Sequence, residues 1–107
     1  MSKFIATHNK GFQMKFENGF SISVQWGPGN YCEKKNTDFH APMKDKFWES
    51  ISAEIAIFDK DGGLVQCGTH DNVSGWLSTD TVAKCIAIVQ SSITKEEITE
   101  KIKTLGL

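Results

Sequence analysis

The chain has 107 residues, enough for one domain with a single hydrophobic core and too few for a second. Its formal net charge is −1 and it has no basic run, which argues against binding a nucleic-acid polymer through a charged face. The longest apolar run, residues 85–89, is too short to span a bilayer, and the first residues lack a signal-peptide core. The 3 cysteines fit reduced thiols, so we expect a cytoplasmic protein with no membrane partner.

Residues 3–7 predict either a short edge strand or a frayed arm. The stretch from Gly11 to Gly29 predicts a β-hairpin, because apolar and polar residues alternate on both sides of residues 17–19. A two-residue Asn18-Gly19 turn would place the two apolar rows on opposite faces. A three-residue loop with Gly19 in the left-handed conformation places both rows on one face. The residue pairs are then Phe16 with Phe20, Met14 with Ile22, and Phe12 with Val24.

The connection over residues 27–46 shows neither a strand nor a helix period and contains both prolines of the chain. A structureless connection of this length is generally either functional or disordered. Gly27, Pro28 and Gly29 force a turn, so we expect at least the start of the connection to be ordered. A second hairpin follows, with strands over residues 52–58 and 64–68 and a turn between them.

From Leu77 the pattern changes to the period of a helix, and Ser78 is its expected N-cap. We expect helices over about residues 78–92 and 94–105, the second beginning with a capping box from Thr94 to Glu97. Strands followed by helices predict an α+β fold: an antiparallel meander of two hairpins over about residues 3–68, with two C-terminal helices packed on one face. The whole chain, residues 1–107, is expected to form a single domain.

Strand directions place two loops at the same end of this meander. The chain leaves the second strand at Trp26 and the fourth at Gly68, so the loops over residues 27–46 and 68–75 share one rim. Aromatic rings beside short amides suit a planar, polar ligand such as a nucleobase with its ribose. The candidate ligand-binding residues are Trp26, Asn30, Tyr31, Trp48, His70, Asn72 and Trp76. Trp26 also fits a core position, and the two asparagines also fit turns.

The chain shows little of the acid, base and nucleophile set that defines an enzyme. His70 and Asp71 are neighbours, but adjacent residues seldom hydrogen-bond in catalytic geometry, and no nucleophile motif accompanies them. Cys67 and His70, together with Cys32 and His40, match no standard zinc spacing. We therefore expect a non-enzymatic protein with no catalytic residue, metal or cofactor.

The run FENGFSISVQWGPGNYC, followed by SAEIAIFDKDGG and a capped C-terminal helix, resembles small proteins encoded in tailed-phage genomes, over roughly residues 12–89. The order of a sheet followed by two helices is also similar to the Thoeris anti-defence type of phage protein, which sequesters ADP-ribose-derived immune signals. The resemblance implies a binding protein that captures a small nucleotide-derived signal, of cyclic oligonucleotide or cyclic ADP-ribose type, to evade host defence. The alternatives are a protein–protein inhibitor of a host enzyme and a minor structural or regulatory phage protein.

Two further expectations concern partners. A homo-oligomer is expected, because the helix from Ser78 is too apolar for one sheet face to hide easily. A diphosphate ligand would need cationic or backbone-amide partners. The candidates are Lys34, Lys35, Lys44 and Lys46, or the amides of Gly27 and Gly29.

Overall fold

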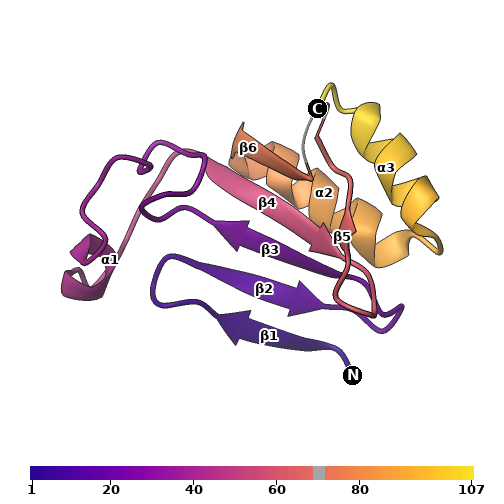
Figure 1. Cartoon of the computed structure of the whole chain (residues 1–107), viewed down its shortest axis with the longest axis horizontal. Coiled ribbons are helices and arrows are strands. Elements are labelled where there is room, and N and C mark those ends of the chain that lie inside the picture. The colour runs from indigo at the N-terminus through magenta and orange to yellow at the C-terminus, as the bar shows by residue number, and fades with distance from the viewer. Residues whose placement is uncertain (69–71) are drawn as a thin grey trace.

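The computed structural model describes residues 1–68 and 72–107. Its strands are β1 (Lys3–Ala6), β2 (Gly11–Lys15), β3 (Ser21–Gln25), β4 (Ala53–Phe58), β5 (Leu64–Val65) and β6 (Val73–Leu77), and its helices are α1 (Ala41–Lys44), α2 (Thr79–Ser91) and α3 (Lys95–Lys103) (Figure 1). The strands form one six-stranded antiparallel sheet in the order β1-β2-β3-β4-β5, with β6 also paired to β4. The predicted α+β fold, a meander followed by two C-terminal helices, is confirmed.

The first hairpin has the register that the three-residue loop predicts. Phe12 pairs with Val24 and Met14 with Ile22, and the Phe16 amide donates to the Phe20 carbonyl at 2.9 Å. Gly19 adopts a φ of 93°, the left-handed region that favours glycine. Because the side-chain period of a strand is two, this register brings the apolar residues of β2 and β3 to the same face.

The N-terminal residues form an edge strand. β1 pairs antiparallel with β2, and its turn to β2 is closed by a hydrogen bond from the Lys10 amide to the Thr7 carbonyl at 3.0 Å. His8 and Asn9, the central residues of that turn, have φ values of 49° and 57°. Two left-handed central residues define a type I′ turn, whose twist suits a hairpin.

Both β5 and β6 pair with the edge of β4 that faces away from β3, each along a different part of its length. The expected return strand over residues 64–68 ends at Val65, and β6 was not expected. β6 runs in the same direction as β5 and pairs with the first part of β4. Ala53 pairs with Leu77 and Ile55 with Ser74, so two residues lie opposite Glu54 in a β-bulge. The first three residues of β6, 73–75, lie in the stretch predicted to be a loop.

Both long helices begin at the expected caps. The Ser78 hydroxyl accepts from the Thr81 amide at 3.2 Å, and the Thr94 hydroxyl accepts from the Glu97 amide at 3.1 Å. The Glu97 carboxylate reaches back to the Ile93 amide at 2.8 Å, which completes a capping box displaced by one residue. The hydrogen bonds that the Lys101 side chain and the Ile93 amide donate to the Glu97 carboxylate lower the pKa of Glu97.

The core lies between the sheet and α2 and α3. Its buried members include Phe20, Ile22, Val24, Ile55, Ile57, Val65, Cys67, Leu77, Val82, Cys85, Val89, Ile98 and Ile102. The monomer therefore buries most of the apolar stripe of α2, while Ala83 and Ala87 stay exposed. No helix of the described residues is long and apolar enough to cross a membrane.

Asn18 ties the first hairpin to the end of α2. Its side-chain amide donates to the carbonyls of Val89 at 2.8 Å, Gln90 at 3.1 Å and Ser92 at 3.0 Å. The last carbonyls of a helix have no partner within the helix, so this amide supplies donors where they are needed. The turn that sets the hairpin register thus also caps α2.

Candidate ligand-binding groove

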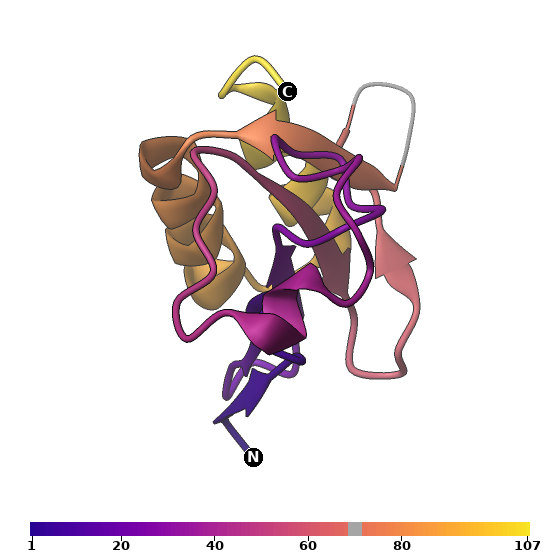
Figure 2. The same cartoon turned by 90° about the vertical axis from the view of Figure 1, so that its left-hand side faces the viewer.

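The long connection between β3 and β4, which we call the arm (residues 27–52), is ordered and projects beyond one end of the sheet (Figures 1 and 2). The side-chain amide of Asn9 holds the part of the arm farthest from the sheet, by donating to the carbonyls of Pro42 at 2.7 Å and Asp45 at 3.0 Å. Nearer the sheet, the Glu33 carboxylate accepts from the Ile51 amide at 2.8 Å. The arm begins and ends beside the sheet, and its last residues, 48–52, line one site.

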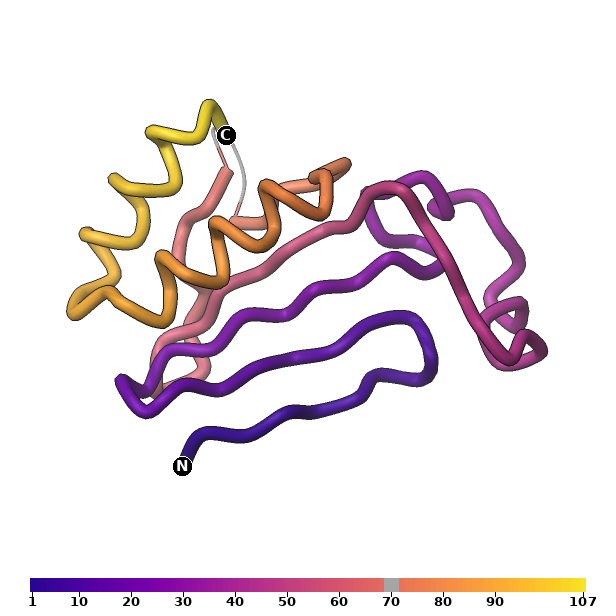
Figure 3. Tube along the Cα trace, turned by 180° about the vertical axis from the view of Figure 1, so that it is seen from behind, coloured from indigo at the N-terminus to yellow at the C-terminus, as the bar shows by residue number. Residues whose placement is uncertain are grey.

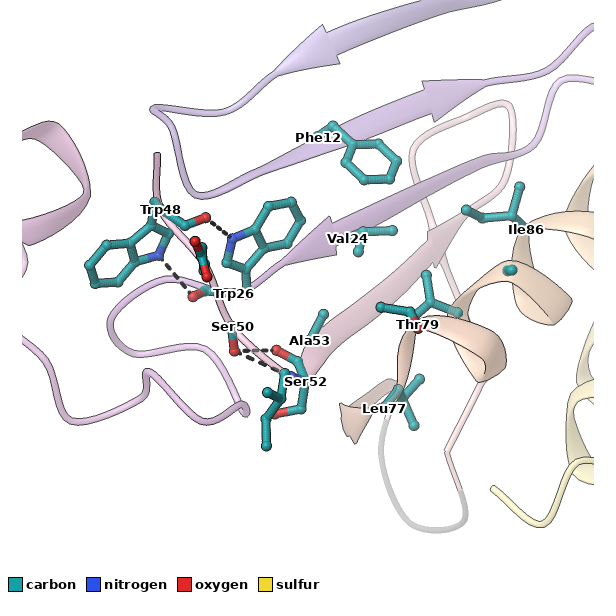
Figure 4. Close-up of a pocket in the computed structure, with 14 residues that line it drawn as sticks. Phe12, Val24, Trp26, Trp48, Ser50, Ser52, Ala53, Leu77, Thr79 and Ile86 are labelled. Carbon is teal, nitrogen blue, oxygen red and sulfur yellow. Dashed lines mark hydrogen bonds between the residues drawn. The ribbon is translucent and has the colours of Figure 1, made fainter. Parts of the chain in front are cut away.

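Two tryptophans join the residue just before the arm, Trp26, to the end of the arm, Trp48. The Trp26 indole donates to the Trp48 carbonyl at 3.0 Å, and the Trp48 indole donates to the Trp26 carbonyl at 3.1 Å (Figure 4). Trp26 also meets Phe12 edge to face, with ring centroids 6.2 Å apart. Both indole N–H groups are therefore satisfied by backbone, which fixes the two rings and leaves their faces as walls.

These rings close one end of a groove of about 360 Å³ between the sheet and the first turns of α2. Its apolar lining comes from Phe12, Val24, Trp26, Trp48, Ile51, Ala53, Leu77, Val82, Ala83 and Ile86. Its polar lining comes from Glu49, Ser50, Ser52 and Thr79. The Ser50 hydroxyl is engaged with the Ser52 carbonyl at 2.6 Å, whereas the Ser52 hydroxyl accepts from the Glu33 amide at 2.9 Å and keeps its own hydrogen to donate.

Tyr31 and Trp76 form a second aromatic pair, away from the groove. Their rings are stacked at 18° with centroids 5.4 Å apart, and the Lys35 ammonium lies 5.3 Å from the Tyr31 centroid. The Tyr31 amide donates to the Glu54 carboxylate at 3.1 Å. Glu54 faces away from the helices, because its neighbours in β4 are buried in the core. The two aromatic pairs therefore lie on opposite sides of the sheet.

The other residues predicted for the rim are placed separately. The Asn30 side chain accepts from the Gly27 amide at 3.2 Å and donates to Glu54 at 3.3 Å, so it shapes the start of the arm. Asn72 lines a different cavity, together with residues of β5 and α3. His70 lies outside the described residues. Of the predicted set, the structure brings Trp26 to Trp48 and Tyr31 to Trp76.

Positive charge lies next to the aromatic end of the groove. The Lys34 ammonium is 5.3 Å from the centroid of the Trp48 ring, a cation–π geometry. The two backbone amides expected to bind phosphate are already used: the Gly27 amide by Asn30, and the Gly29 amide by the Lys35 carbonyl at 2.9 Å. Of the predicted phosphate partners, Lys34 contacts the Trp48 ring but does not itself line the groove.

The cysteines lie inside the molecule. Cys32, Cys67 and Cys85 are buried and free. Burial raises the pKa of Cys67 to about 12, that of Cys85 to about 11, and that of Cys32 above its ordinary value. The described residues contain no group of three histidine, cysteine, aspartate or glutamate side chains placed to hold a metal ion.

Sequence reasoning missed most of the groove lining, notably Phe12, Thr79, Ala83 and Ile86. A signal for Phe12 was present, because its pairing with Val24 puts it on the same face as Trp26, which directly follows β3. The lining from α2 had no such signal, because only the packing of the helix over the sheet decides which of its residues border a space. Comparisons of the chain with protein-family models, curated protein sequences and solved structures find no significant match.

Proposed function

We propose that this protein is a non-enzymatic binding protein that sequesters a small nucleotide-derived ligand in the groove. The observation that carries the proposal is the pair of fixed indole rings, Trp26 and Trp48, at one end of an apolar space of about 360 Å³. Small-molecule sites typically occupy about 300–1,000 Å³ and combine apolar walls with a few polar groups. A planar base fits such walls, because stacking on aromatic faces is tolerant of base identity.

The polar groups of the groove suit the edge of a base. Glu49 is the one ionisable residue among the described residues that line the groove, and its carboxylate can accept from exocyclic amino or ring N–H groups. The Ser52 hydroxyl supplies a donor. Lys34, beside Trp48, supplies the cation that a phosphate needs. Among the described residues that line the groove there is no histidine, lysine or cysteine to activate the Ser50, Ser52 or Thr79 hydroxyl, which supports binding rather than turnover.

The proposed ligand is a cyclic oligonucleotide or a cyclic ADP-ribose, in line with the phage proteins that the sequence resembles. Its capture in the host cytoplasm would let a phage evade a defence system that uses such a signal. A thermal-shift screen against cyclic dinucleotides, cyclic trinucleotides and cyclic ADP-ribose isomers tests the proposal. A ligand at about a hundred times its dissociation constant adds about 2.7 kcal/mol of stability. That corresponds to a rise in Tm of roughly 10 °C for a domain of this size.

Two substitutions on α2 make the screen specific for the groove. Ala83 lines the groove and is exposed, so Ala83→Trp should fill the space and abolish the shift. Lys84, on the same helix and also exposed, does not line the groove, so Lys84→Trp should keep the shift. The proposal fails if no ligand of the panel shifts the Tm, or if both variants respond like the wild type. Recovery of a chemically changed ligand would instead indicate an enzyme.

The proposal extends to a homo-oligomer built on the outer surface of α2. The monomer already buries Val82, Cys85 and Val89, so Ala83 and Ala87 are what the helix leaves exposed for another copy. Sedimentation velocity over a range of concentrations tests this expectation. A monomer at every concentration would rule it out.

Binding to a protein is the second candidate function, and the arm favours it. Phe39, Met43 and Phe47 are 76%, 69% and 77% exposed. Exposed aromatic and methionine side chains gathered on one ordered segment are typical of interaction surfaces. Replacing all three by serine should abolish retention of a bacterial partner that the wild-type protein holds in a pull-down. Equal retention by the wild type and the triple-serine variant would exclude these three side chains of the arm as the binding surface.

A further inference from the structure

The groove has its charge at one point of its lining. Most of the lining is apolar, and among the described residues that line it Glu49 alone has an ionisable side chain. Glu49 lies between Trp48 and Ser50, on the last part of the arm, which runs from α1 back to β4 (Figure 3). In an otherwise apolar groove, this carboxylate is the strongest hydrogen-bond acceptor that a ligand meets.

The other carboxylates beside this part of the arm are already engaged. The Glu33 carboxylate accepts from the Ile51 amide at 2.8 Å, and the Glu54 carboxylate accepts from the Tyr31 amide at 3.1 Å. Within residues 1–68 and 72–107, no backbone amide or side chain donates to the Glu49 carboxylate, and neither ion pair involves it. Glu49 is exposed and has both carboxylate oxygens available for a ligand.

The lining also decides which part of a nucleotide enters the groove. No described lining residue carries a positive charge. A phosphate placed there would lose its hydration without gaining a partner, and Glu49 would repel it. An uncharged base avoids this cost and can stack on the rings of Trp26 and Trp48, which reciprocal hydrogen bonds hold in place (Figure 4). The base therefore occupies the groove, and the sugar and phosphate remain outside it.

The carboxylate of Glu49 distinguishes between the bases. A carboxylate only accepts hydrogen bonds, and its two oxygens suit two neighbouring donors. Guanine presents such a pair on its Watson–Crick edge, the N1–H group and the 2-amino group. Adenine and cytosine place an acceptor nitrogen beside their amino group, and uracil has one N–H group between two carbonyl oxygens. Guanine alone among these bases therefore satisfies both carboxylate oxygens.

Ser52 supplies a donor that fits the same edge. Its hydroxyl lines the groove, accepts from the Glu33 amide at 2.9 Å and keeps its own hydrogen to donate. Guanine carries the acceptor O6 next to its N1–H group. The hydroxyl and the carboxylate together thus match the three polar groups along one edge of guanine.

We propose that the groove selects guanine and that Glu49 is the residue that determines this specificity. The inference rests on the function proposed above and narrows its ligand. A cyclic oligonucleotide that contains guanine fits the groove, whereas a cyclic ADP-ribose carries adenine. At an adenine edge, one oxygen of the Glu49 carboxylate would face the lone pair of a ring nitrogen.

The 5′-monophosphates of guanosine, inosine and adenosine test the proposal on the intact protein, because they share the sugar and the phosphate. Inosine monophosphate differs from guanosine monophosphate only in lacking the 2-amino group. Titrations followed by the NMR signals of the Trp26 and Trp48 indole N–H groups report binding in the groove. We expect guanosine monophosphate to bind at least roughly tenfold more tightly than the other two, as for a hydrogen bond to a charged group.

Glu49→Gln tests the role of the carboxylate. It keeps the size of the side chain and replaces one acceptor oxygen by an NH₂ donor. Guanosine monophosphate should bind at least roughly tenfold more weakly to this variant. Adenosine monophosphate should bind more tightly, because a glutamine amide can donate to the ring nitrogen of adenine and accept from its amino group.

The matched control is Glu96→Gln, the same change at an exposed position that does not line the groove. It should leave all three dissociation constants unchanged within about twofold, and both variants should fold, since the replaced side chains are exposed. A fall in affinity of the same size in Glu96→Gln would overturn the role of Glu49, because it would reflect net charge alone.

The outcomes separate this inference from the proposed function. Equal affinities for the three nucleotides, or a guanosine preference that survives Glu49→Gln, would overturn the guanine specificity and leave the groove as a ligand site. Silence of both indole signals, together with a cyclic ligand that shifts the Tm, would have the same meaning. If no nucleotide of either kind binds, or if Ala83→Trp leaves binding intact, the proposed function fails and the guanine specificity fails with it.

Discussion

The side-chain amide of Asn18 gives the most direct test of how the first hairpin stabilises the helical layer. Its Nδ2 atom lies within hydrogen-bond distance of three carbonyls at the end of α2, those of Val89, Gln90 and Ser92. Asn18→Asp keeps the size of the side chain and the acceptor that receives the Phe20 amide at 3.0 Å. It removes both donor hydrogens and places a negative charge at the negative end of the helix dipole.

The expected loss follows from these contacts. An amide group has two hydrogens, so it makes about two full hydrogen bonds, each contributing about 1 kcal/mol net. The charge at the helix end adds about 0.5 kcal/mol for a site as exposed as this one. The free energy of unfolding should therefore fall by about 2 to 3 kcal/mol, which lowers Tm by roughly 10 °C. Below about pH 4 the new carboxyl group is protonated and can donate again, so part of the loss should be recovered.

Urea denaturation followed by tryptophan fluorescence, at neutral pH and near pH 3.5, measures both effects relative to wild type. Asn36→Asp makes the same chemical change at an exposed position of the arm and serves as the control, with an expected effect within about 0.5 kcal/mol. A neutral-pH loss for Asn18→Asp no larger than that of the control would refute the reasoning. So would a loss that is identical at both pH values.

Three further outcomes are expected. Gly75→Ala would place a Cβ atom 2.4 Å from the Cβ atom of Tyr31, so it should push Tyr31 off its stacking partner, change the tryptophan emission and cost about 1 to 3 kcal/mol. Gly19→Ala, at a φ of 93°, should lower the free energy of unfolding by about 1 kcal/mol in urea titrations. Burial raises the pKa of Cys67 to about 12 and of Cys85 to about 11, from 9.0, so their contribution to stability is complete below pH 9.0 and is lost as the pH rises toward those values. Unfolding free energies at pH 8 and near pH 10.5 should show this fall, and replacing both cysteines by alanine should flatten it.

Opposite results have clear meanings. An unchanged emission spectrum in Gly75→Ala would mean that the Tyr31 backbone moves with its ring. A Gly19→Ala variant as stable as wild type would contradict the left-handed turn. A pH slope that is the same with and without the two cysteines would assign the alkaline loss to other groups.

The elements with a regular period could be predicted from the sequence. Alternation on both sides of residues 17–19 fixed the register, because a turn one residue shorter would have separated the apolar rows. The helix starts followed from Ser78 and Thr94, whose hydroxyls make the expected cap bonds. In both the hairpin and the helix starts, the local sequence preference and the packing of the core favour the same structure.

β6 could not be predicted, because its bulge breaks the period. Gly75 and Trp76 both lie opposite Glu54, so alternation is lost in the middle of a five-residue strand. Trp76 has a φ of 52°, which is rare for a bulky residue and has no local sequence signal. Pairing with β4 imposes this strand, so it is a tertiary effect.

The candidate site was predictable in its composition and only partly in its arrangement. Strand direction placed Trp26 near the returning arm, and the structure joins it to Trp48. The division of the aromatic residues between two sides depends on the arm bringing Tyr31 to Glu54. The arm has no period, so its path is set by individual hydrogen bonds such as those of Asn9.

The hydrogen bonds between the Asn18 side chain and the end of α2 also affect how readily Asn18 deamidates. In a flexible chain an asparagine before a glycine loses its amide readily, because the next backbone nitrogen attacks the side-chain carbonyl carbon; asparagine is a thermolabile residue for this reason. In the fold, the Gly19 amide donates to the Phe16 carbonyl at 3.0 Å and the Asn18 side chain is held by three carbonyls. The fraction of chains deamidated at Asn18 should therefore increase with the time that the protein spends unfolded. Each deamidation replaces the Asn18 amide by a carboxylate, which is repelled by the carbonyls at the end of α2. The free energy of unfolding therefore falls, and the altered chain unfolds more easily.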